Sequence, residues 1–457
     1  MQIAFTVDNC SVNFKEACRD GDLPTAFKDL QNIANYNISD LVKQNSKLLV
    51  FPQALGDVRD RFGDSPICNL CGSADALDKA KIETGNVMGF VGSNDTELRI
   101  RSRFAMSDDV DYFLHYMLQR VFSINVVDFK VGKDDDSVFD FLLYLFPHFL
   151  KKAVVLGVYK EYLTQEKNDD RVHGPIDISR HIHYNIPFNG KIAYKTREYS
   201  YDNRITQLVR HTIEYIASTK QSAILSVDND VKDCIAKIRE ATPSYSLRDR
   251  YSIVQKNGTP VRNPYFMEYN ALQRLCVFIL MHKRLKFDHE KNEVYGILFD
   301  GAWLWEEYLW TILKGHGFEH PENKERTGKW QLFSDNSYYP RYPDFFNDSQ
   351  KFVLDAKYKR LAYINDKEKM SKSIPREDLH QLTAYLHISQ FNKGGFAFPD
   401  ADGAVNGYAH EIGTLNGFGG KIGIYGFPVP KGSECSDFAK FCDEMKTAED
   451  IFVAAVQ

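Results

Sequence analysis

The chain has 457 residues, a formal net charge of −5, 43% hydrophobic residues and 13% aromatic residues. This length predicts two or three domains, and the apolar content is sufficient for packed cores rather than a disordered chain. No apolar run reaches membrane length and the first residues carry no basic segment, which argues against a membrane protein and a secretory leader. Eight cysteines give no disulfide density, so we expect a cytoplasmic protein.

Residues 1–165 are expected to form an N-terminal mixed α/β region. Their pattern predicts a hairpin around Ser93-Asn94-Asp95, a helix over 109–121, and a long amphipathic helix from the acidic run at 134–136 to about residue 165.

Residues 166–288 are expected to form a middle region of strands and helices. A charged linker at 166–170 precedes predicted β structure over 171–200. A helix over 201–219, with Asp202 near its cap, and another over 265–285 complete the region.

Residues 289–457 contain the elements that suggest a reaction. A helix is predicted over 297–313, and two strands over 341–346 and 351–358 are joined by a turn at Asn347-Asp348-Ser349. A helix behind Pro375, with Pro375 as its first residue, then carries Gln381 and Tyr385 on one face. A glycine-rich stretch, a strand over 423–427 and a final helix from about residue 436 end the chain.

The predicted hairpin brings together residue types that suit phosphodiester cleavage. Asp344 precedes Asp355 by eleven positions, and Asp355 and Lys357 share one face of their strand because side chains alternate along it. Mg²⁺ prefers oxygen ligands, which Asp344 and Asp355 would supply, and Glu306 of the upstream helix would complete the acidic cluster, with Glu307 as its competitor. Lys357 would offset negative charge that develops at the scissile phosphate.

A lone Asp-x-Lys strand is a weak signal, and residues 126–130 contain a second one at Asp128 and Lys130. That second copy has no Pro-Asp hairpin before it and no Gln-x-x-x-Tyr helix after it. The order of all four parts therefore favours the site at Asp355.

Two other motifs are weaker. Cys68-x-x-Cys71 lacks a second pair at zinc-binding spacing, so a turn with two reduced cysteines is favoured over a zinc site. The segment 417–422 lacks the first glycine of a phosphate-binding loop and has Ile422 in place of the Ser or Thr that would bind Mg²⁺, so we expect a flexible connection or a hairpin.

Several motifs together resemble the McrC family, the nuclease subunits of McrBC-type or related LlaJI-type restriction systems in the PD-(D/E)xK superfamily. The resemblance is strongest over 290–390 and weaker toward the N-terminus. It is carried by these segments: Ile297-Leu298-Phe299-Asp300, Leu304-Trp305-Glu306, Tyr342-Pro343-Asp344, Asp355-Ala356-Lys357-Tyr358-Lys359, Gly174-Pro175-Ile176-Asp177, Tyr201-Asp202-Asn203-Arg204 and Asn263-Pro264-Tyr265.

The resemblance implies a multi-domain α+β or α/β protein. A mixed α/β partner-binding region would precede a C-terminal nuclease domain with a mixed sheet flanked by helices. It also implies catalytic roles for Glu306, Asp344, Asp355, Lys357, Gln381 and Tyr385, with Glu306, Asp344 and Asp355 binding Mg²⁺, which Mn²⁺ could replace.

The resemblance further implies two macromolecular partners, double-stranded DNA and a McrB-like AAA+ GTPase hexamer. GTP would be bound only by that partner, which residues 1–285 would dock on and stimulate. The net charge agrees, because a protein that holds DNA alone usually has a basic surplus. Basic residues near the site could contact phosphates or belong to a solvated loop: Lys357, Lys359, Arg360, Lys367, Lys369, Lys372 and Arg376.

Two other functions remain open from the sequence. One is a non-catalytic assembly subunit that keeps the nuclease fold as a scaffold, against which the intact Asp344, Asp355 and Lys357 argue. The other is a stand-alone repair or transposition nuclease, against which the large N-terminal half argues. A neighbouring gene for an AAA+ GTPase would favour the restriction subunit.

Overall fold

We describe a computed structural model of the chain. It defines the structure of all residues except 1, 19–20, 46–47, 53–60, 74–75, 106–110, 123–136, 220, 227, 286–293, 322–327, 336, 361–373, 406–407 and 418. The second Asp-x-Lys segment, the start of the helix expected from residue 134, and Lys367, Lys369 and Lys372 lie outside the described residues.

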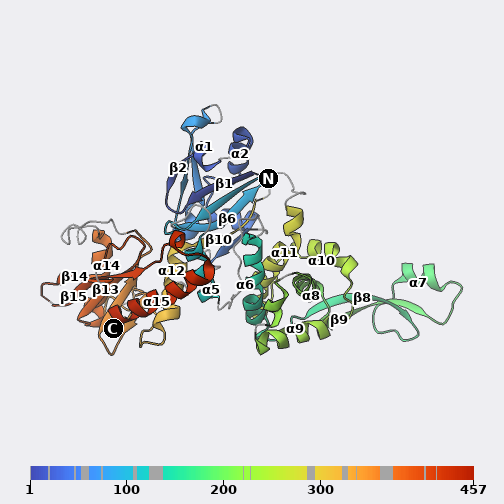
Figure 1. The fold of residues 1–457 in the computed structure, drawn as a ribbon. Coiled ribbons are helices and arrows are strands. Elements are labelled where there is room, and N and C mark those ends of the chain that lie inside the picture. Colours follow the sequence, from blue (N-terminus) through green and yellow to red (C-terminus); the bar gives the residue numbers. More distant parts are fainter. Residues whose placement is uncertain are drawn as a thin grey trace. The chain divides into compact units, whose positions relative to one another are not determined.

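The chain forms two compact units (Figure 1). One combines residues 1–137 with 288–457, and the other comprises residues 138–287. This division differs from the three consecutive domains expected at 1–165, 166–288 and 289–457. The reason is strand β10 (Val294–Asp300), which lies in the same sheet as strands from the first hundred residues.

The first unit contains an N-terminal sheet of five strands in the order β1-β7-β6-β10-β3. β10 pairs antiparallel with β6 and parallel with β3, while β1 pairs parallel with β7. The predicted hairpin at residues 93–95 is confirmed as the turn between β6 and β7. The other strands are β1 (Gln2–Val7), β3 (Leu48–Phe51), β6 (Val87–Ser93) and β7 (Thr96–Arg101).

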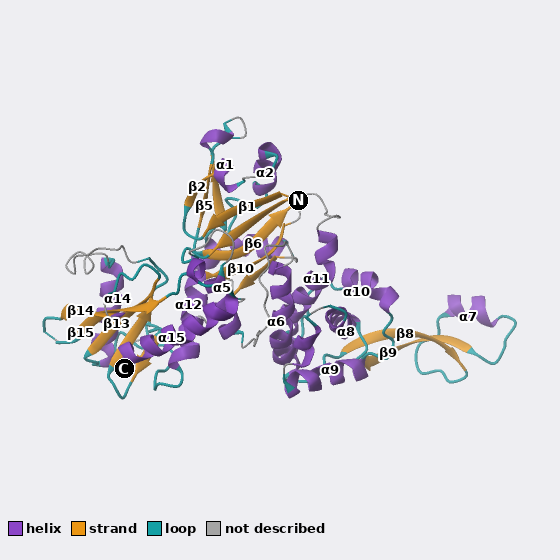
Figure 2. Ribbon diagram, viewed as in Figure 1, coloured by secondary structure: helices purple, strands orange, loops and turns teal. Residues whose placement is uncertain are grey.

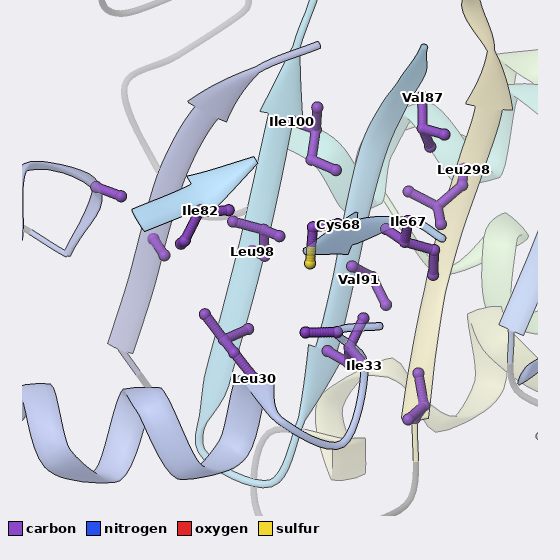
Figure 3. Close-up of a cluster of buried hydrophobic side chains, with 14 of the residues drawn as sticks. Leu30, Ile33, Ile67, Cys68, Ile82, Val87, Val91, Leu98, Ile100 and Leu298 are labelled. Atoms are coloured by element: carbon purple, nitrogen blue, oxygen red, sulfur yellow. The ribbon is translucent and has the colours of Figure 1, made fainter. Parts of the chain in front are cut away.

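A smaller sheet and short helices complete this half of the unit. Strands of the smaller sheet run in the order β2-β5-β4, and apolar side chains from both sheets and the helices share one core (Figure 3). The elements are β2 (Ser11–Asn13), β4 (Cys68–Cys71), β5 (Lys81–Thr84), α1 (Phe14–Ala17), α2 (Leu23–Leu30), α3 (Ile38–Gln44) and α4 (Arg61–Asp64).

The turn expected at Cys68 and Cys71 is wrong, because both residues lie on strand β4. Residues three apart on a strand face opposite sides, and Cys68 is buried whereas Cys71 is exposed. Burial raises the pKa of the Cys68 thiol to about 12.

The helix expected over 297–313 is only partly correct. Residues Val294–Asp300 form β10, and helix α12 runs over Gly301–Leu313 with Asp300 as its N-cap. Every residue of β10 is buried, because the strand has neighbours on both edges and packing on both faces. A fully buried strand has no alternation that would separate it from a buried helix by periodicity.

The second sheet of this unit runs in the order β11-β12-β13-β15-β14. Its central strands β12, β13 and β15 are parallel, and the edge strands β11 and β14 are antiparallel to their neighbours. In the segment 417–422, Lys421 and Ile422 begin β15 and pair with Thr414 and Gly413 of β14, as the predicted hairpin requires. The strands are β11 (Phe345–Asn347), β12 (Phe352–Ala356), β13 (Lys393–Asp400), β14 (Ala409–Thr414) and β15 (Lys421–Pro428).

Helices cover both faces of this second sheet. On one face, α14 (Arg376–Ser389) packs its Leu382 and Leu386 on Val353 of β12. On the other face lie α12 and α15 (Phe438–Val456), which contact Phe427 of β15 through Trp305 and Phe452. Helix α5 (Tyr112–Val121) packs on α12. Asp355 and Lys357 alternate with Leu354 and Ala356, so they point to the α14 face.

The second unit is a group of helices with a two-stranded ribbon. Helices α8 and α11 pack together, and Asn203 caps α8. The helices are α6 (Ser137–Val154), α8 (Arg204–Ala217), α9 (Asn229–Ala241), α10 (Arg250–Lys256) and α11 (Tyr269–Leu285).

The ribbon pairs β8 (Glu161–Asp169) with β9 (Ile192–Ser200), and α7 (Ile178–Asn185) lies near its far end (Figure 2). The sequence predicted β9, but it missed both α7 and β8. The long helix expected to reach residue 165 ends at Val154, and Gly157 adopts a φ of +100° that a right-handed helix cannot contain.

The mixed α/β class expected from the sequence is confirmed by these sheets and helices. No helix among the described residues has the length and apolar character needed to cross a membrane.

Candidate active site

The β11–β12 hairpin places Asp344 beside Asp355. Phe345 pairs with Leu354 in the antiparallel register, so the residue before β11 lies next to the end of β12. In the turn, the Asn347 side chain accepts hydrogen bonds from Ser349 Oγ at 2.7 Å and from the Gln350 amide at 3.1 Å. These bonds fix the turn, and a fixed turn sets the register of a hairpin.

The two carboxylates are buried and close together. Asp344 Oδ2 accepts a hydrogen bond from the Ala356 amide at 2.7 Å. Burial and the Glu306 carboxylate raise the pKa of Asp344 to about 6. Burial and the Asp344 carboxylate raise the pKa of Asp355 to about 7. The site therefore holds more negative charge than its own surroundings compensate.

Asp355 is buried and has few partners. Its side chain is 0% exposed, and Lys357 Nζ lies 2.6 Å from Oδ2 in an ion pair. Apart from Lys357, neither oxygen has a hydrogen-bond partner in the described part of the chain. Buried polar groups are nearly always fully hydrogen-bonded, so a buried carboxylate with a single partner is a candidate cation ligand.

Lys357 lies at the centre of the site. Besides Asp355, its Nζ lies 3.4 Å from Gln381 Oε1 and 3.9 Å from Asp378 Oδ1. Burial lowers the pKa of Lys357, but the Asp355 and Asp344 carboxylates outweigh burial and raise the pKa above its ordinary value. Lys357 is therefore protonated at neutral pH, a state that suits an electrostatic role and not that of a general base.

Helix α14 orients Lys357 through a chain of hydrogen bonds. Gln381 Nε2 donates to Tyr385 Oη at 2.7 Å, and the Tyr385 hydroxyl donates to the Tyr342 carbonyl at 2.7 Å. These bonds direct Gln381 Oε1 toward the lysine. Helical spacing predicted the shared face of Gln381 and Tyr385, and the structure brings both residues to the site. Pro375 is the N-cap of α14 and not its first residue.

His320 is the residue that the sequence did not reveal. Its Nδ1 lies 2.8 Å from the Asp344 carbonyl, and its Nε2 lies 3.8 Å from Glu306 Oε1 and 3.9 Å from Glu307 Oε1. Burial lowers the pKa of His320, but the Glu307 and Glu306 carboxylates and the Asp344 carbonyl outweigh burial and raise it to about 9. A single histidine in an irregular segment gives no sequence signal for such a role.

The donor set fits a hard divalent cation. Mg²⁺ is usually held by one or two carboxylates together with water and substrate phosphate. Asp344 and Asp355 match this pattern, and Asp355 Oδ1 has no hydrogen-bond partner in the described part of the chain. No group of three or more His, Cys, Asp or Glu side chains in the described part of the chain is arranged to hold a metal by itself. Glu306 influences Asp344 by its charge and is less exposed than Glu307, at 12% against 33% of the side chain.

Comparisons with known proteins give a family and a similar fold. A family model described as McrBC 5-methylcytosine restriction system component matches residues 82–399. The fold is similar to a chain in the refined half-complex of the tetradecameric assembly of Thermococcus gammatolerans McrB AAA+ hexamers with bound McrC. That match has 15% identity and a TM-score of 0.50, and it covers 99% of both chains.

A second match is weaker. A chain of the Thermococcus gammatolerans McrBC complex matches with 14% identity and a TM-score of 0.34, covering 68% of this chain and 87% of that one, and supports no further argument. No curated protein matches the chain.

Proposed function

The chain belongs to the McrBC 5-methylcytosine restriction system component family, and from this premise we propose that it is the Mg²⁺-dependent DNA endonuclease subunit of a two-component restriction system. The proposal includes a PD-(D/E)xK type of nuclease domain built on the second sheet. It also includes a McrB-like AAA+ GTPase hexamer as the partner whose GTP hydrolysis this chain stimulates.

One observation supports the nuclease assignment above all others. Asp355 is a fully buried carboxylate whose described partner is the Lys357 ammonium, and it lies beside a second buried carboxylate that the same lysine must also compensate. Two buried carboxylates close together repel each other, which disfavours the charged form of both. Their presence is explained if the two side chains bind a cation during function.

Asp344 and Asp355 would hold the Mg²⁺, with Glu306 near them. The bound ion would polarise the phosphoryl oxygen and lower the pKa of the attacking water. Lys357, which stays protonated, would stabilise the negative charge that develops on the phosphoryl group. Gln381 holds the Lys357 ammonium in place, and Tyr385 holds Gln381 through its bond to the Tyr342 carbonyl.

The proposed docking surface for the partner is the α7 end of the ribbon in the second unit. Large apolar side chains are exposed on α7 and directly after it: Ile178 is 69% exposed, Ile182 55%, Ile186 63% and Phe188 69%. Exposed apolar groups of this size commonly mark protein interaction sites. The proposal agrees with the neighbour in which McrC is bound to McrB hexamers.

Neither of the two other functions has a specific observation in its favour. A scaffold without activity gains nothing from two buried carboxylates that share one lysine. A stand-alone nuclease would leave the apolar ribbon without a role.

Metal dependence tests the proposal directly. We expect the chain, assembled with its AAA+ partner and GTP, to cut DNA in Mg²⁺ or Mn²⁺ and to lose activity in EDTA. Ca²⁺ should bind without supporting cleavage, because its looser coordination places the water poorly. DNA cleavage that persists at full rate in a chelator would exclude the proposed chemistry.

A further inference from the structure

His320 lies between two parts of the candidate site that come from different elements. Its Nδ1 faces the Asp344 carbonyl at 2.8 Å, and its Nε2 faces the carboxylates of Glu306 and Glu307 on α12. A carbonyl oxygen only accepts hydrogen bonds, so Nδ1 carries a proton and donates to Asp344. Nε2, at 3.8 and 3.9 Å from the carboxylate oxygens, lies beyond hydrogen-bond distance.

The position of this ring is fixed by packing and by the backbone. The side chain is 4% exposed. The ring lies 4.9 Å from the Phe345 ring and 5.6 Å from the Trp310 ring, measured between centroids. The preceding residue, Glu319, exchanges two backbone hydrogen bonds with Phe346 at 2.7 and 3.1 Å. His320 is therefore held beside β11, next to Asp344, by contacts that need no metal.

We propose that His320 is a positioning residue for the metal-binding Asp344. Its Nδ1–H donates to the Asp344 carbonyl and so fixes the backbone at this residue. With the Ala356 amide on Oδ2 and His320 on the carbonyl, Asp344 is fixed from two sides. The inference rests on the proposed nuclease function and adds a residue to it.

His320 acts through its neighbours and does not contact the substrate. Groups that orient metal ligands from behind typically change metal affinity or activity by about 10–100-fold when removed. Loss of the Nδ1 bond should therefore lower kcat at saturating Mg²⁺ and leave KM for DNA unchanged.

Two substitutions separate the roles of the two nitrogens. Asparagine places its amide N–H near the position of Nδ1, and glutamine places it near that of Nε2. In the assembled complex, we expect His320→Asn to keep most of the wild-type kcat. His320→Gln should lose about 10–100-fold, and His320→Ala should lose at least as much. His316→Asn, on an exposed histidine four residues earlier, is the matched control and should have no effect.

Thermal unfolding and partner binding should be measured for every variant, because these controls distinguish a lower kcat from a smaller fraction of folded protein. The inference is overturned if His320→Ala cuts at the wild-type rate in saturating Mg²⁺, or if His320→Asn is as slow as His320→Gln. The nuclease proposal itself fails differently, because then wild-type cleavage would be absent or would not depend on Asp355.

Discussion

At the scale of single residues, the candidate site is defined by two buried carboxylates, Asp344 and Asp355, that share one lysine. Asp355 and Asp344 both have a raised pKa, to about 7 and about 6, and Lys357 lies against Asp355. A site arranged for a cation is expected to destabilise the fold while the cation is absent. The same residues should therefore contribute to activity and reduce stability.

Asp355→Asn should stabilise the metal-free protein. The pKa of Asp355 is raised from 3.8 to about 7 in the folded state, so between these pH values the folded state binds more protons than the unfolded state. Its contribution to the free energy of unfolding then falls as pH rises. In EDTA at pH 8, the variant should be more stable by about 1–3 kcal/mol. The gap should shrink toward pH 5.

Thermal unfolding with and without Mg²⁺ measures this effect. Mg²⁺ should raise the Tm of the wild type, because a ligand that binds only the folded state stabilises it, and should raise the Tm of Asp355→Asn much less. A variant that is less stable than the wild type at pH 8 in EDTA would contradict the interpretation of Asp355 as a buried carboxylate that destabilises the metal-free fold.

Lys357→Ala should slow cleavage by about 10²–10³-fold, the usual effect of removing one group that stabilises transition-state charge. Lys357→Arg should restore little, because the guanidinium does not fit the volume and geometry of a buried ammonium site. Lys351→Ala is the control, since Lys351 is half-exposed in the hairpin turn, where its ammonium pairs with Asp348 and lies over the Phe391 ring. Single-turnover rates of DNA cleavage in saturating Mg²⁺ measure these effects, and a wild-type rate for Lys357→Ala would contradict the proposed role of Lys357.

At the scale of elements, local patterns predicted the hairpin and α14 well. Alternation along β12 placed Asp355 and Lys357 on one face, and helical spacing placed Gln381 and Tyr385 on another. The structure shows these two faces meeting, with Lys357 Nζ at 3.4 Å from Gln381 Oε1. Both motifs are short and continuous in sequence, so their geometry follows from periods of about 2 and 3.6 residues.

The elements that the sequence did not predict depend on contacts with distant residues. β10 is a strand because β6 and β3 lie on either side of it, and its own residues fit a buried helix equally well. β8 alternates only between half-buried and exposed residues, which leaves little apolar signal. His320 acquires its role from residues 14 positions before and 24 positions after it, which no local pattern connects.

The α7 end of the ribbon should bind the AAA+ partner whether or not the chain can cleave DNA. Ile182→Asp and Phe188→Asp should weaken the complex with the AAA+ partner and reduce stimulation of its GTP hydrolysis. Both side chains are more than half exposed, so the fold should be retained. Leu247→Asp is the control, because Leu247 is 62% exposed elsewhere in the same unit.

Size-exclusion chromatography and GTPase assays check this prediction. Unchanged binding in both ribbon variants, or loss of binding in Leu247→Asp alone, would place the docking surface elsewhere.

At the scale of the whole molecule, the second sheet, which carries the candidate site, and the N-terminal sheet belong to one unit. Tyr358, directly after Lys357, shares a hydrogen bond of 2.7 Å with Ser102 Oγ and lies 3.2 Å from Met88 Sδ. A cut near residue 285 would remove β10 from the N-terminal sheet. The proposal that residues 1–285 bind and stimulate the partner while the remainder cleaves DNA is therefore best tested with point variants in the full chain.

The net charge of −5 bears on how strongly this chain can bind DNA without its partner. Affinity for DNA comes largely from contacts with phosphates, and this chain has no basic surplus to supply many of them. We expect weak DNA binding and little cleavage by the chain alone. Assembly with the AAA+ partner should be needed for site-specific cutting.

Cleavage by the assembled complex carrying Asp355→Asn tests the central claim most directly. In Mg²⁺ and GTP, the variant should cut no DNA above background while it still binds the partner and stimulates GTP hydrolysis. Asp348→Asn, in the turn of the same hairpin and 70% exposed, should cut at the wild-type rate. Cleavage at the wild-type rate by Asp355→Asn would contradict the assignment of this hairpin as the metal-dependent active site.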